Sequence, residues 1–308
     1  MAPTYFPAIS SYGVKYSFIS LIRLFFTYSY PRVLFSAYDL HFLPSKTRMK
    51  LYEEIKEYSK ESIVFLDSGV YEGYWKADKR WFPSLYKESL ARIEFDLYSS
   101  FDVLPRRNSE DFAKRAIDSI LASKILSDRP GFVPILHGIS PDRLIFLVDD
   151  FVRKYPDLCD FIAVAERDCG DDVVERAHTI CRIRNLLDGE DVANRKRILH
   201  VLGCGNPISL LLLSYCGANT FDSLDWIKHV IDPKRLGVSD FSHLKLTECN
   251  CTVCADAKRP YIETALLHNL LFYQNYMIQI QNLIKENELS RLLERYVGQD
   301  MLQEISKA

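Results

Sequence analysis

The sequence predicts an α/β fold: a (β/α)8 (TIM) barrel that carries a helical subregion near its C-terminal end. Three observations favour this class. Short apolar runs alternate with helical segments over most of the 308 residues, ionisable residues follow these runs at nearly constant intervals, and no Pro/Gly-rich linker divides the chain. We therefore expect residues 1–308 to form one domain. The rival fold is an open doubly wound sheet, whose ligands also bind at the C-terminal ends of strands.

The expected strands are short runs rich in β-branched and aromatic residues, separated by segments with helical periodicity. We expect strands at residues 33–38, 63–66, 101–104, 133–136, 161–164, 198–202 and 220–221, and helices at 48–59, 110–126, 141–154 and 173–187. No strand is evident before Tyr5. Residues 16–30 are apolar but fewer than the about 20 that a membrane span needs, and Arg23 lies at their centre. We expect a buried helix there and no membrane partner.

Ionisable residues lie in or just after the expected strands at regular intervals. Asp67 follows residues 63–66, and Asp102, His137 and Glu166 come 35, 35 and 29 residues further along in turn. This interval is the length of one strand–helix unit. In a barrel it would bring these side chains together at the C-terminal face of the strands, where ligands bind.

Two carboxylates are candidates for reacting groups. Asp67 and Asp222 each follow or end an expected strand, and Asp225 comes close behind Asp222. Carboxylates that face one pocket can act as nucleophile and acid/base on a glycosidic carbon. The alternative for Asp67, which precedes Ser68-Gly69, is a structural role in a turn or at a helix start. Between them, Gly203-Cys204-Gly205 lacks the third glycine of a dinucleotide-binding loop and is expected to admit a ligand close to the backbone.

Three cysteines and one histidine near the C-terminus have the spacing of a zinc site. Cys249, Cys251 and Cys254 lie within six residues, and His268 follows on a helical segment that begins at Tyr261. Together they supply the four ligands of tetrahedral zinc and leave no open position for water. We expect a structural zinc ion in a subregion at 245–308 that clips the last helices to the barrel. The alternative is a set of unrelated structural cysteines.

The remaining composition restricts the class of protein. The other five cysteines are scattered and no secretory signal is evident, which indicates a reducing, cytoplasmic compartment. The net charge of −2 and the pI of about 6.4 argue against broad non-specific binding of nucleic acid. Local basic clusters remain as candidate phosphate contacts or as solvated faces: Arg106-Arg107, Arg182 with Arg184, Arg195-Lys196-Arg197, Lys234-Arg235 and Lys258-Arg259.

Three ordered motifs resemble the tRNA-guanine transglycosylase superfamily. HVLGCGNPISLLLLSYCGANTFDSLDW resembles its signature of a glycine turn, a helix and Phe-Asp-Ser, and FLDSGVYEG resembles its Asp-Ser-Gly motif. ECNCTVC followed by LLHNLLFY resembles its zinc site. The resemblance runs from about residue 63 to the end of the helix that contains His268. It implies a (β/α)8 barrel and a pentosyltransferase that exchanges a guanine base in a nucleic acid.

The segments AERDCGDD, GCGNPIS and FDSLDW are most similar to the DNA-modifying branch of this superfamily, which places 7-deazaguanine (preQ0-type) bases into DNA. The resemblance therefore implies DNA, in preference to tRNA, and a 7-deazaguanine base as partners. Because the target base must leave the stack to be reached, a helper protein that opens the duplex is a further candidate partner.

The resemblance also implies which residues react. Asp222 matches the family's nucleophile, which attacks C1′ and forms a covalent glycosyl-enzyme. Asp67 matches its acid/base, which takes a proton from the incoming base. The metal ligands of the family are matched by Cys249, Cys251, Cys254 and His268.

Five further residues match positions that bind the base. Asp102 matches the carboxylate that reads the base edge. His137 stands where the tRNA-acting enzymes commonly have Gln, and it is expected to hydrogen-bond a carbonyl. Glu166 follows the strand that contacts the 7-substituent. Gly203 and Gly205 are expected to let the backbone approach the ligand.

Three departures weaken a tRNA assignment. The spacer between Cys254 and His268 is short, the usual N-terminal strands are not evident, and no RNA-binding module is evident after the barrel. Base exchange on tRNA nevertheless remains an alternative. A nucleoside hydrolase of the same fold, in which water replaces the incoming base, and a non-catalytic partner subunit remain alternatives as well.

Overall fold

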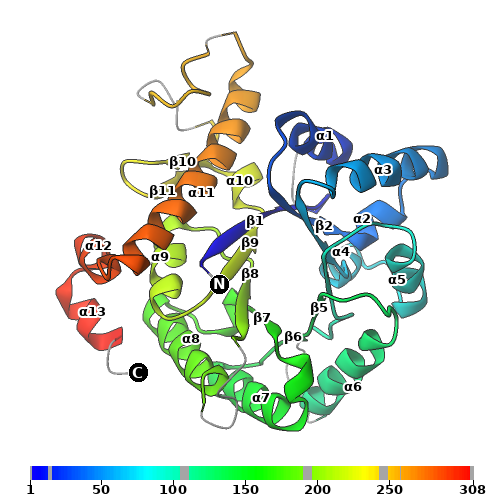
Figure 1. Ribbon diagram of the computed structural model, residues 1–308, viewed down its shortest axis with the longest axis horizontal. Coiled ribbons are helices and arrows are strands. Elements are labelled where there is room, and N and C mark those ends of the chain that lie inside the picture. The colour runs from blue at the N-terminus through cyan, green and yellow to red at the C-terminus, as the bar shows by residue number, and fades with distance from the viewer. Residues whose placement is uncertain are drawn as a thin grey trace.

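The computed structural model describes residues 2–12, 16–104, 111–189, 196–242, 249–256 and 258–305. Its main sheet is wholly parallel and has the strand order β5-β4-β3-β2-β1-β9-β8-β7-β6. Figure 1 shows these strands around the centre of the molecule and helices outside them. The strands are β1 (Thr4–Ile9), β2 (Arg32–Ser36), β3 (Ile63–Asp67), β4 (Leu97–Ser99), β5 (Phe132–Val133), β6 (Ile135–Leu136), β7 (Phe161–Ala165), β8 (Ile198–Leu202) and β9 (Thr220–Ser223).

The sheet closes into a barrel of eight chain segments, because β5 and β6 are two halves of one segment. Pro134 lies between them and has no N–H to donate, which interrupts the strand. β5 pairs with β4 on one side and β6 pairs with β7 on the other, while the Pro134 carbonyl accepts a hydrogen bond from Ala163 N at 2.9 Å. The predicted (β/α)8 barrel is confirmed.

Two strand predictions need correction. The strand expected at 101–104 is wrong, because the strand in that unit is β4, at Leu97–Ser99. The Phe101 backbone instead bonds to a helix: its N–H donates to Ser123 Oγ (2.8 Å) and its carbonyl accepts from Ser119 Oγ (2.5 Å). β1 was not predicted at all. It contains a proline and is buried at all six positions, so it shows no alternation of polar and apolar residues.

The expected helices are present with small shifts in their ends, and the apolar segment at 16–30 forms the buried helix α1. The helices before the C-terminal subregion are α1 (Phe18–Tyr28), α2 (Ala37–His41), α3 (Ser45–Tyr58), α4 (Val70–Trp75), α5 (Pro83–Leu90), α6 (Phe112–Lys124), α7 (Pro141–Lys154), α8 (Val173–Leu187), α9 (Pro207–Tyr215) and α10 (Asp225–Lys228). Short 3-10 turns lie at Pro156–Leu158 and Glu166–Asp168, and a hairpin of β10 (Val230–Asp232) and β11 (Gly237–Ser239) follows α10.

Apolar side chains fill two regions. A large cluster lies between the strands and the surrounding helices. A smaller one joins side chains from five of the strand segments, namely Phe6, Ala8, Leu34, Phe65, Val133, Ile135, Phe161 and Ala163. This second cluster is the filled interior of a barrel, which supports the site at one end of the strands.

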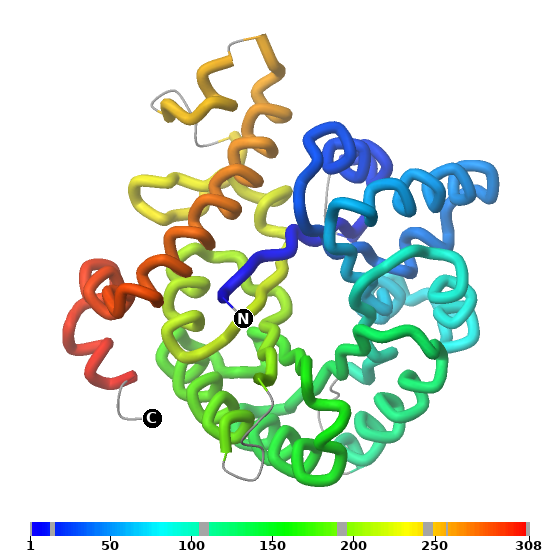
Figure 2. The backbone as a smooth tube through the Cα atoms, viewed as in Figure 1, coloured from blue at the N-terminus to red at the C-terminus, as the bar shows by residue number. Residues whose placement is uncertain are grey.

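The C-terminal helices pack along one side of the barrel, as Figure 2 shows. They are α11 (Tyr261–Lys285), α12 (Leu289–Val297) and α13 (Gln299–Ile305). On α11, the ring of Tyr273 stacks on Tyr5 of β1 at 4.0 Å between centroids, and its hydroxyl donates to the Gly205 carbonyl at 2.7 Å. These contacts tie α11 to the first strand and to the glycine turn after β8.

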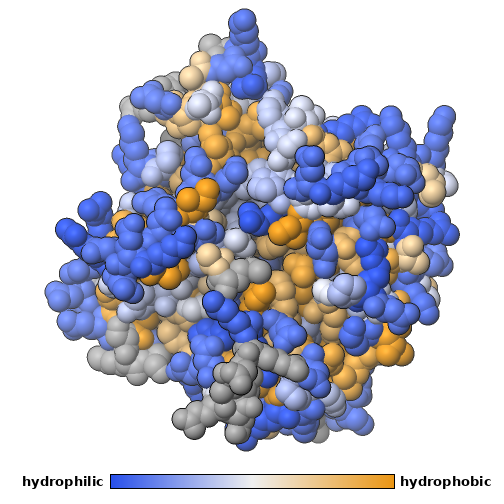
Figure 3. All heavy atoms as spheres, viewed as in Figure 1, coloured by the Kyte–Doolittle hydropathy of each residue, from blue (hydrophilic) through white to orange (hydrophobic). Residues whose placement is uncertain are grey.

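No helix in the described ranges has both the length and the apolar character needed to cross a membrane. On the face seen in Figure 3, hydrophilic side chains cover most of the outer rim, and hydrophobic ones gather in smaller patches.

Candidate active site and metal centre

A cavity of about 350 Å³ lies at the C-terminal ends of the barrel strands. It collects the side chains that the sequence placed after successive strands. Its lining includes Asp67, Asp102, His137, Glu166, Gly203 and Asp222, together with Glu72, Asp225 and the cations Arg167, Arg176 and Lys228. Residues that are regularly spaced in the sequence therefore line one cavity, as expected for parallel strands around a barrel.

Asp222 lies near the end of β9, is 7% exposed, and is held by two donors through the same oxygen. Its Oδ1 accepts from the Gly203 N–H at 3.2 Å and lies 3.1 Å from His200 Nε2. The other carboxylate oxygen makes no hydrogen bond with the residues that the structure describes. One oxygen is therefore anchored, and the residue lines the cavity, an arrangement suited to a nucleophile.

His200 orients Asp222 from inside the barrel. It is fully buried, and its ring lies among those of Phe6, Phe65 and Phe161 at 5.4 to 6.3 Å between centroids. Its Nδ1 is 2.8 Å from Thr220 Oγ1. With Nε2–H donating to the carboxylate, Nδ1 can accept from the threonine hydroxyl, so both ring nitrogens have a partner.

Asp67, at the end of β3, carries a carboxyl group that stays protonated at neutral pH. Burial raises its pKa to about 8, and the charges of Asp102 and Glu72 add to this effect against the opposing N–H of Gly69. Its Oδ2 accepts from the Gly69 N–H at 2.9 Å and its Oδ1 from Ser99 Oγ at 3.1 Å. The turn role considered for Asp67 is therefore present together with a perturbed acid in the cavity.

Asp102 belongs to a chain of three buried ionisable side chains. Its Oδ2 lies 2.9 Å from His137 Nε2, and His137 Nδ1 lies 2.7 Å from Asp168 Oδ2. Its other oxygen accepts from Ser68 Oγ at 3.0 Å. His137 therefore has both ring nitrogens engaged by carboxylates.

The two carboxylates make His137 an imidazolium. Burial by itself lowers the pKa of His137, but the hydrogen bonds and charges of Asp102 and Asp168 outweigh it and raise the pKa to about 9. A protonated ring donates to both partners at once, which fixes the direction of the Asp102 carboxylate in the cavity.

Two glutamates line the cavity, one hydrogen-bonded to an arginine and the other with an oxygen that has no partner among the described residues. Glu166 accepts a hydrogen bond from Arg176 NH1 at 3.2 Å, and burial raises its pKa although Arg176 opposes the shift. Glu72 is 5% exposed, and its Oε2 has no hydrogen-bond partner among the residues that the structure describes. Burial, reinforced by the charge of Asp39, raises the pKa of Glu72 to about 7.

The two glycines of the turn after β8 have different structural roles. Gly203 has φ of +76°, is open to the cavity, and offers its N–H to Asp222. A Cβ on Gly205 would meet Ser223 Oγ at 1.9 Å. Gly205 is thus required by packing of the turn against β9, and it is not among the residues that line the cavity.

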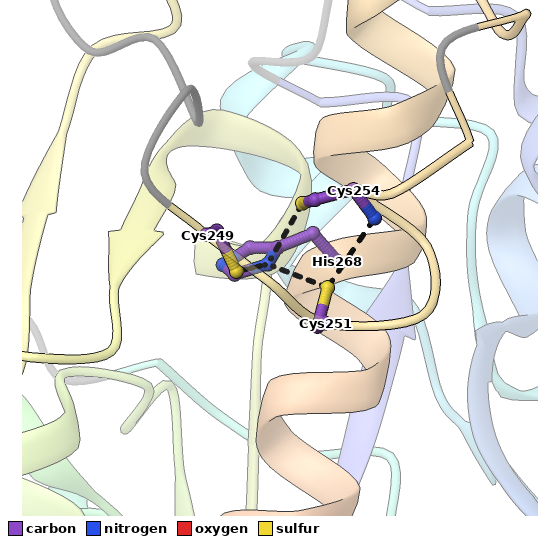
Figure 4. Close-up of side chains that lie close together, drawn as sticks. All are labelled: Cys249, Cys251, Cys254 and His268. Atoms are coloured by element: carbon purple, nitrogen blue, oxygen red, sulfur yellow. Dashed lines mark hydrogen bonds between the residues drawn. The ribbon is translucent and has the colours of Figure 1, made fainter.

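The four predicted metal ligands converge, as Figure 4 shows. Their ligand atoms lie within 4.8 Å of one another. His268 Nδ1 is 3.5 Å from Cys249 Sγ, 3.6 Å from Cys251 Sγ and 3.5 Å from Cys254 Sγ. Tetrahedral bonds of about 2.3 Å to sulfur and about 2.05 Å to nitrogen require a separation of about 3.6 Å. The cluster therefore fits a tetrahedral metal ion such as zinc.

The candidate metal centre is connected to the barrel by the residue pair His268-Asn269. His268 Nε2 donates to the Ile231 carbonyl at 3.0 Å, which leaves Nδ1 for the metal. Asn269 accepts from the Ile231 N–H at 3.0 Å and donates to the Trp226 carbonyl at 2.8 Å. Trp226 in turn donates through Nε1 to the Ala8 carbonyl at 2.8 Å, at the end of β1. The cluster thus fastens α11 to the segment that follows Asp222.

Most of the predicted basic clusters are engaged away from the cavity. Arg106, Arg107 and Arg195 lie outside the described residues. Other members form ion pairs: Arg182 with Asp142, Arg184 with Asp188, Arg235 with Asp232 and Arg259 with Asp256. The cations at the cavity, Arg167, Arg176 and Lys228, were not among the predicted clusters.

Comparison with known proteins finds relatives that match only part of this chain. No model of a protein family matches the chain. The tRNA-guanine(15) transglycosylase of Archaeoglobus fulgidus is 26% identical over 170 residues, 46% of this chain and 34% of that protein. Those of Thermococcus onnurineus and Pyrococcus furiosus are 27% identical over 129 and 110 residues, 37% and 32% of this chain. These similarities support a relationship to the tRNA-guanine transglycosylase superfamily. The chain covers only 34%, 22% and 19% of the three relatives' own lengths.

Proposed function

We propose that this protein is a base-exchange transglycosylase that replaces guanine in a nucleic acid, DNA in preference to tRNA, with a 7-deazaguanine base of the preQ0 type. The observation that carries the proposal is the meeting of Asp222, Asp67 and Asp102 on one cavity at the C-terminal ends of the strands. An anchored carboxylate, a protonated acid and a carboxylate aimed at a base edge are the three groups that such an exchange requires.

In the first half of the reaction, the free oxygen of Asp222 attacks C1′ of the target nucleotide. The C1′–N9 bond breaks, and a covalent glycosyl-enzyme forms with the C1′ carbon bonded to Asp222. The departing guanine takes a proton from Asp67, whose raised pKa keeps it protonated at neutral pH. His200 and the Gly203 N–H hold the attacking group in place.

In the second half, the same groups act in reverse. N9 of the incoming 7-deazaguanine attacks C1′, the bond to Asp222 breaks, and the N9 proton passes to Asp67. Because one glycosidic bond is exchanged for another, the reaction needs no redox cofactor or nucleoside triphosphate. If water entered in place of the base, the outcome would be hydrolysis, so the cavity must favour the base over water.

The base itself would be read by Asp102 and Glu166. We propose that Asp102 accepts hydrogen bonds from the N–H groups of the guanine-type edge, and that Glu166 lies near the 7-substituent. His137, whose two nitrogens already contact Asp102 and Asp168, is better assigned to positioning Asp102 than to contacting a base carbonyl. Gly203 would admit the ligand to the backbone, while the packing of Gly205 gives it a structural role.

We propose that zinc occupies the cluster of Cys249, Cys251, Cys254 and His268 and is structural. Four protein ligands complete its tetrahedral shell, and the ion would stabilise the loop against α11. The catalytic steps then rest on side chains of the barrel. We further propose that residues 1–308 act as one domain in the cytoplasm, where the five cysteines outside the cluster stay reduced.

DNA and tRNA are the two candidate substrate polymers. The similarity of AERDCGDD and FDSLDW to the DNA-modifying branch favours DNA, and Asp168 in the first of these segments contacts His137 in the site. tRNA is the second candidate, because the partial relatives bear the name tRNA-guanine(15) transglycosylase. Either polymer must present an unstacked guanine, which for duplex DNA calls for base extrusion or a helper protein.

The deciding experiment supplies preQ0 and follows release of labelled guanine from single-stranded DNA, duplex DNA and tRNA. We expect release from DNA with the unmodified protein and none with Asp222→Ala, whose fold is checked by its metal content. Release from tRNA alone would overturn the choice of DNA. Full activity of Asp222→Ala would contradict the nucleophile assignment, and guanine release without incorporation of preQ0 would indicate the hydrolase.

A further inference from the structure

A cluster of aromatic side chains, the rim aromatic cluster, lies beside the cavity on α4 and the chain after β1. Its members are Tyr12, Tyr71, Tyr74 and Trp75. Tyr71, Tyr74 and Trp75 are 37%, 51% and 49% exposed and share one face of α4 through their three- and four-residue spacing. Neighbouring ring centroids are 5.3 to 6.0 Å apart, and Tyr12 is stacked on Trp75 with 21° between the ring planes.

This cluster is continuous with the cavity. Tyr71 lines the cavity and also contacts the rings of Tyr12 and Trp75. Trp75 is the most exposed of the three tryptophans in the chain, since Trp81 and Trp226 are 8% and 0% exposed. Large aromatic surfaces that remain open next to a reactive site usually mark a place where a ligand binds.

Positive charges accompany the aromatic surface. The guanidinium of Arg167 lies 5.8 Å from the centroid of the Tyr71 ring. The Arg167 side chain is 47% exposed and also pairs with Asp168 at 3.4 Å. Lys79, four residues after Trp75, is exposed, whereas Lys76 is paired with Asp39 at 3.1 Å. Aromatic rings interleaved with cations are the pattern by which proteins hold single-stranded nucleic acid, because every base has a face that can stack and every phosphate carries a negative charge.

We infer that the rim aromatic cluster is a stacking platform for the base that flanks the exchanged nucleotide in a single strand. This inference rests on the proposed function, since it assumes that the cavity receives a nucleotide. Extrusion of the target base deprives its neighbour of a stacking partner. The exposed ring of Trp75 or Tyr74, about one helical turn from Tyr71 along α4, replaces that partner. A protein ligand is less well suited, because the cluster ends at the cavity and has the cations Arg167 and Lys79 beside it.

The test needs no base exchange: the affinity of every protein is read from the fluorescence anisotropy of a labelled oligonucleotide, and the emission of Trp75 is a second signal in the unmodified protein. A single-stranded DNA of twelve nucleotides with one guanine, its RNA counterpart and the matching duplex DNA are titrated separately without any acceptor base. We expect each single strand to quench the emission more than the duplex does. Trp75→Ala is expected to weaken binding of the single strand by about 10- to 100-fold, whereas Trp75→Phe keeps a ring and stays near the unmodified affinity.

Two controls make the test specific. Phe146→Ala removes another exposed ring, 63% exposed on α7, and should leave binding unchanged. An oligonucleotide with an abasic site next to the guanine should bind the unmodified protein as weakly as the intact strand binds Trp75→Ala. In Trp75→Ala, an abasic site on the side of the guanine that stacks on the rim aromatic cluster should cause no further loss of affinity, because the stacking contact is already lost.

The inference is overturned if Trp75→Ala binds the single strand as tightly as the unmodified protein, or if no single strand binds. It is also overturned if the affinity lost through Trp75→Ala and the affinity lost through the abasic site add up whether that site lies on the 5′ or the 3′ side of the guanine. Guanine exchange is measured separately on the same strands. Coupling between Trp75 and the flanking base without any exchange would retain the platform and reject the transglycosylase. Exchange without that coupling would do the opposite.

Discussion

Replacing Asp168 by Asn tests whether His137 is an imidazolium that holds Asp102. In the folded protein the pKa of His137 is raised from 6.5 to about 9, which at about 1.4 kcal/mol per pKa unit corresponds to about 3 kcal/mol. Two carboxylates share this effect at 2.7 and 2.9 Å. The Asn side chain keeps the shape but removes one charge, so we expect the pKa of His137 to fall and about half of that free energy to be lost.

The sign of the pH dependence follows from the raised pKa. The folded state binds the His137 proton more tightly than the unfolded state, so this stabilisation is complete below pH 6.5 and is lost as the pH rises to about 9. Between pH 6 and 9.5, the free energy of unfolding should fall less in Asp168→Asn than in the unmodified protein, by roughly half as much.

Urea unfolding at several pH values measures this difference, and the NMR signal of the His137 ring reports its pKa directly. Asp142→Asn, which removes an exposed carboxylate paired with Arg182, is the matched control and should leave both unchanged. A His137 ring that titrates near 6.5 in the unmodified protein, or whose pKa is the same in Asp168→Asn, would refute the reasoning.

Three further predictions concern the reaction and the metal. Because Asp67 must be protonated to assist guanine departure, the rate of guanine release should fall as the pH rises through about 8, and a rate that is flat from pH 6 to 9.5 would count against this acid. His200→Phe keeps the aromatic packing but removes the donor to Asp222, so kcat should fall by about 100-fold with little change in KM, and His200→Gln should recover part of the loss; equal rates in all three proteins would exclude a positioning role. Cys251→Ala should lose one equivalent of zinc, measured by atomic emission, and melt at a lower temperature, whereas Asp222→Ala should keep its zinc; a metal-free protein of unchanged stability would argue against a structural site.

The part of the site that could be predicted from sequence depends on one rule of parallel sheets. Asp67, Glu166 and Asp222 end or follow apolar runs, and strands of a barrel all deliver their C-terminal ends to one face. The metal ligands could be predicted for another local reason, since Cys249, Cys251 and Cys254 are almost adjacent in the chain. Both predictions depend only on the positions of these residues along the chain.

The partners of these groups could not be predicted, because they depend on register between strands. His200 lies in the middle of β8, where its sequence context is that of any buried residue. Only the pairing of His200 with Thr220 brings it beside Asp222, two residues further along β9. Asp168 lies in a 3-10 turn after β7, and folding alone brings it to His137.

The errors in the strands have equally local causes. In the fourth unit, Phe101 and Val103 are apolar enough to suggest a strand, but Ser119 and Ser123 of α6 bond to the Phe101 backbone and end the sheet before it. β1 was not predicted because Pro7 lies within it. The nearby parallel strands and α11 bury β1 regardless of its weak intrinsic preference.

The central claim, that Asp222 attacks C1′ of a nucleotide, is tested most directly by trapping the intermediate. Single-stranded DNA with a 5′ label and one guanine is incubated with the protein without an acceptor base, and the mixture is separated on a denaturing gel. We predict a labelled protein–DNA adduct that peptide mass spectrometry maps to Asp222, that disappears on addition of preQ0, and that Asp222→Asn does not form. An adduct on another residue, or guanine release by the unmodified protein with no adduct at any time, would contradict the account.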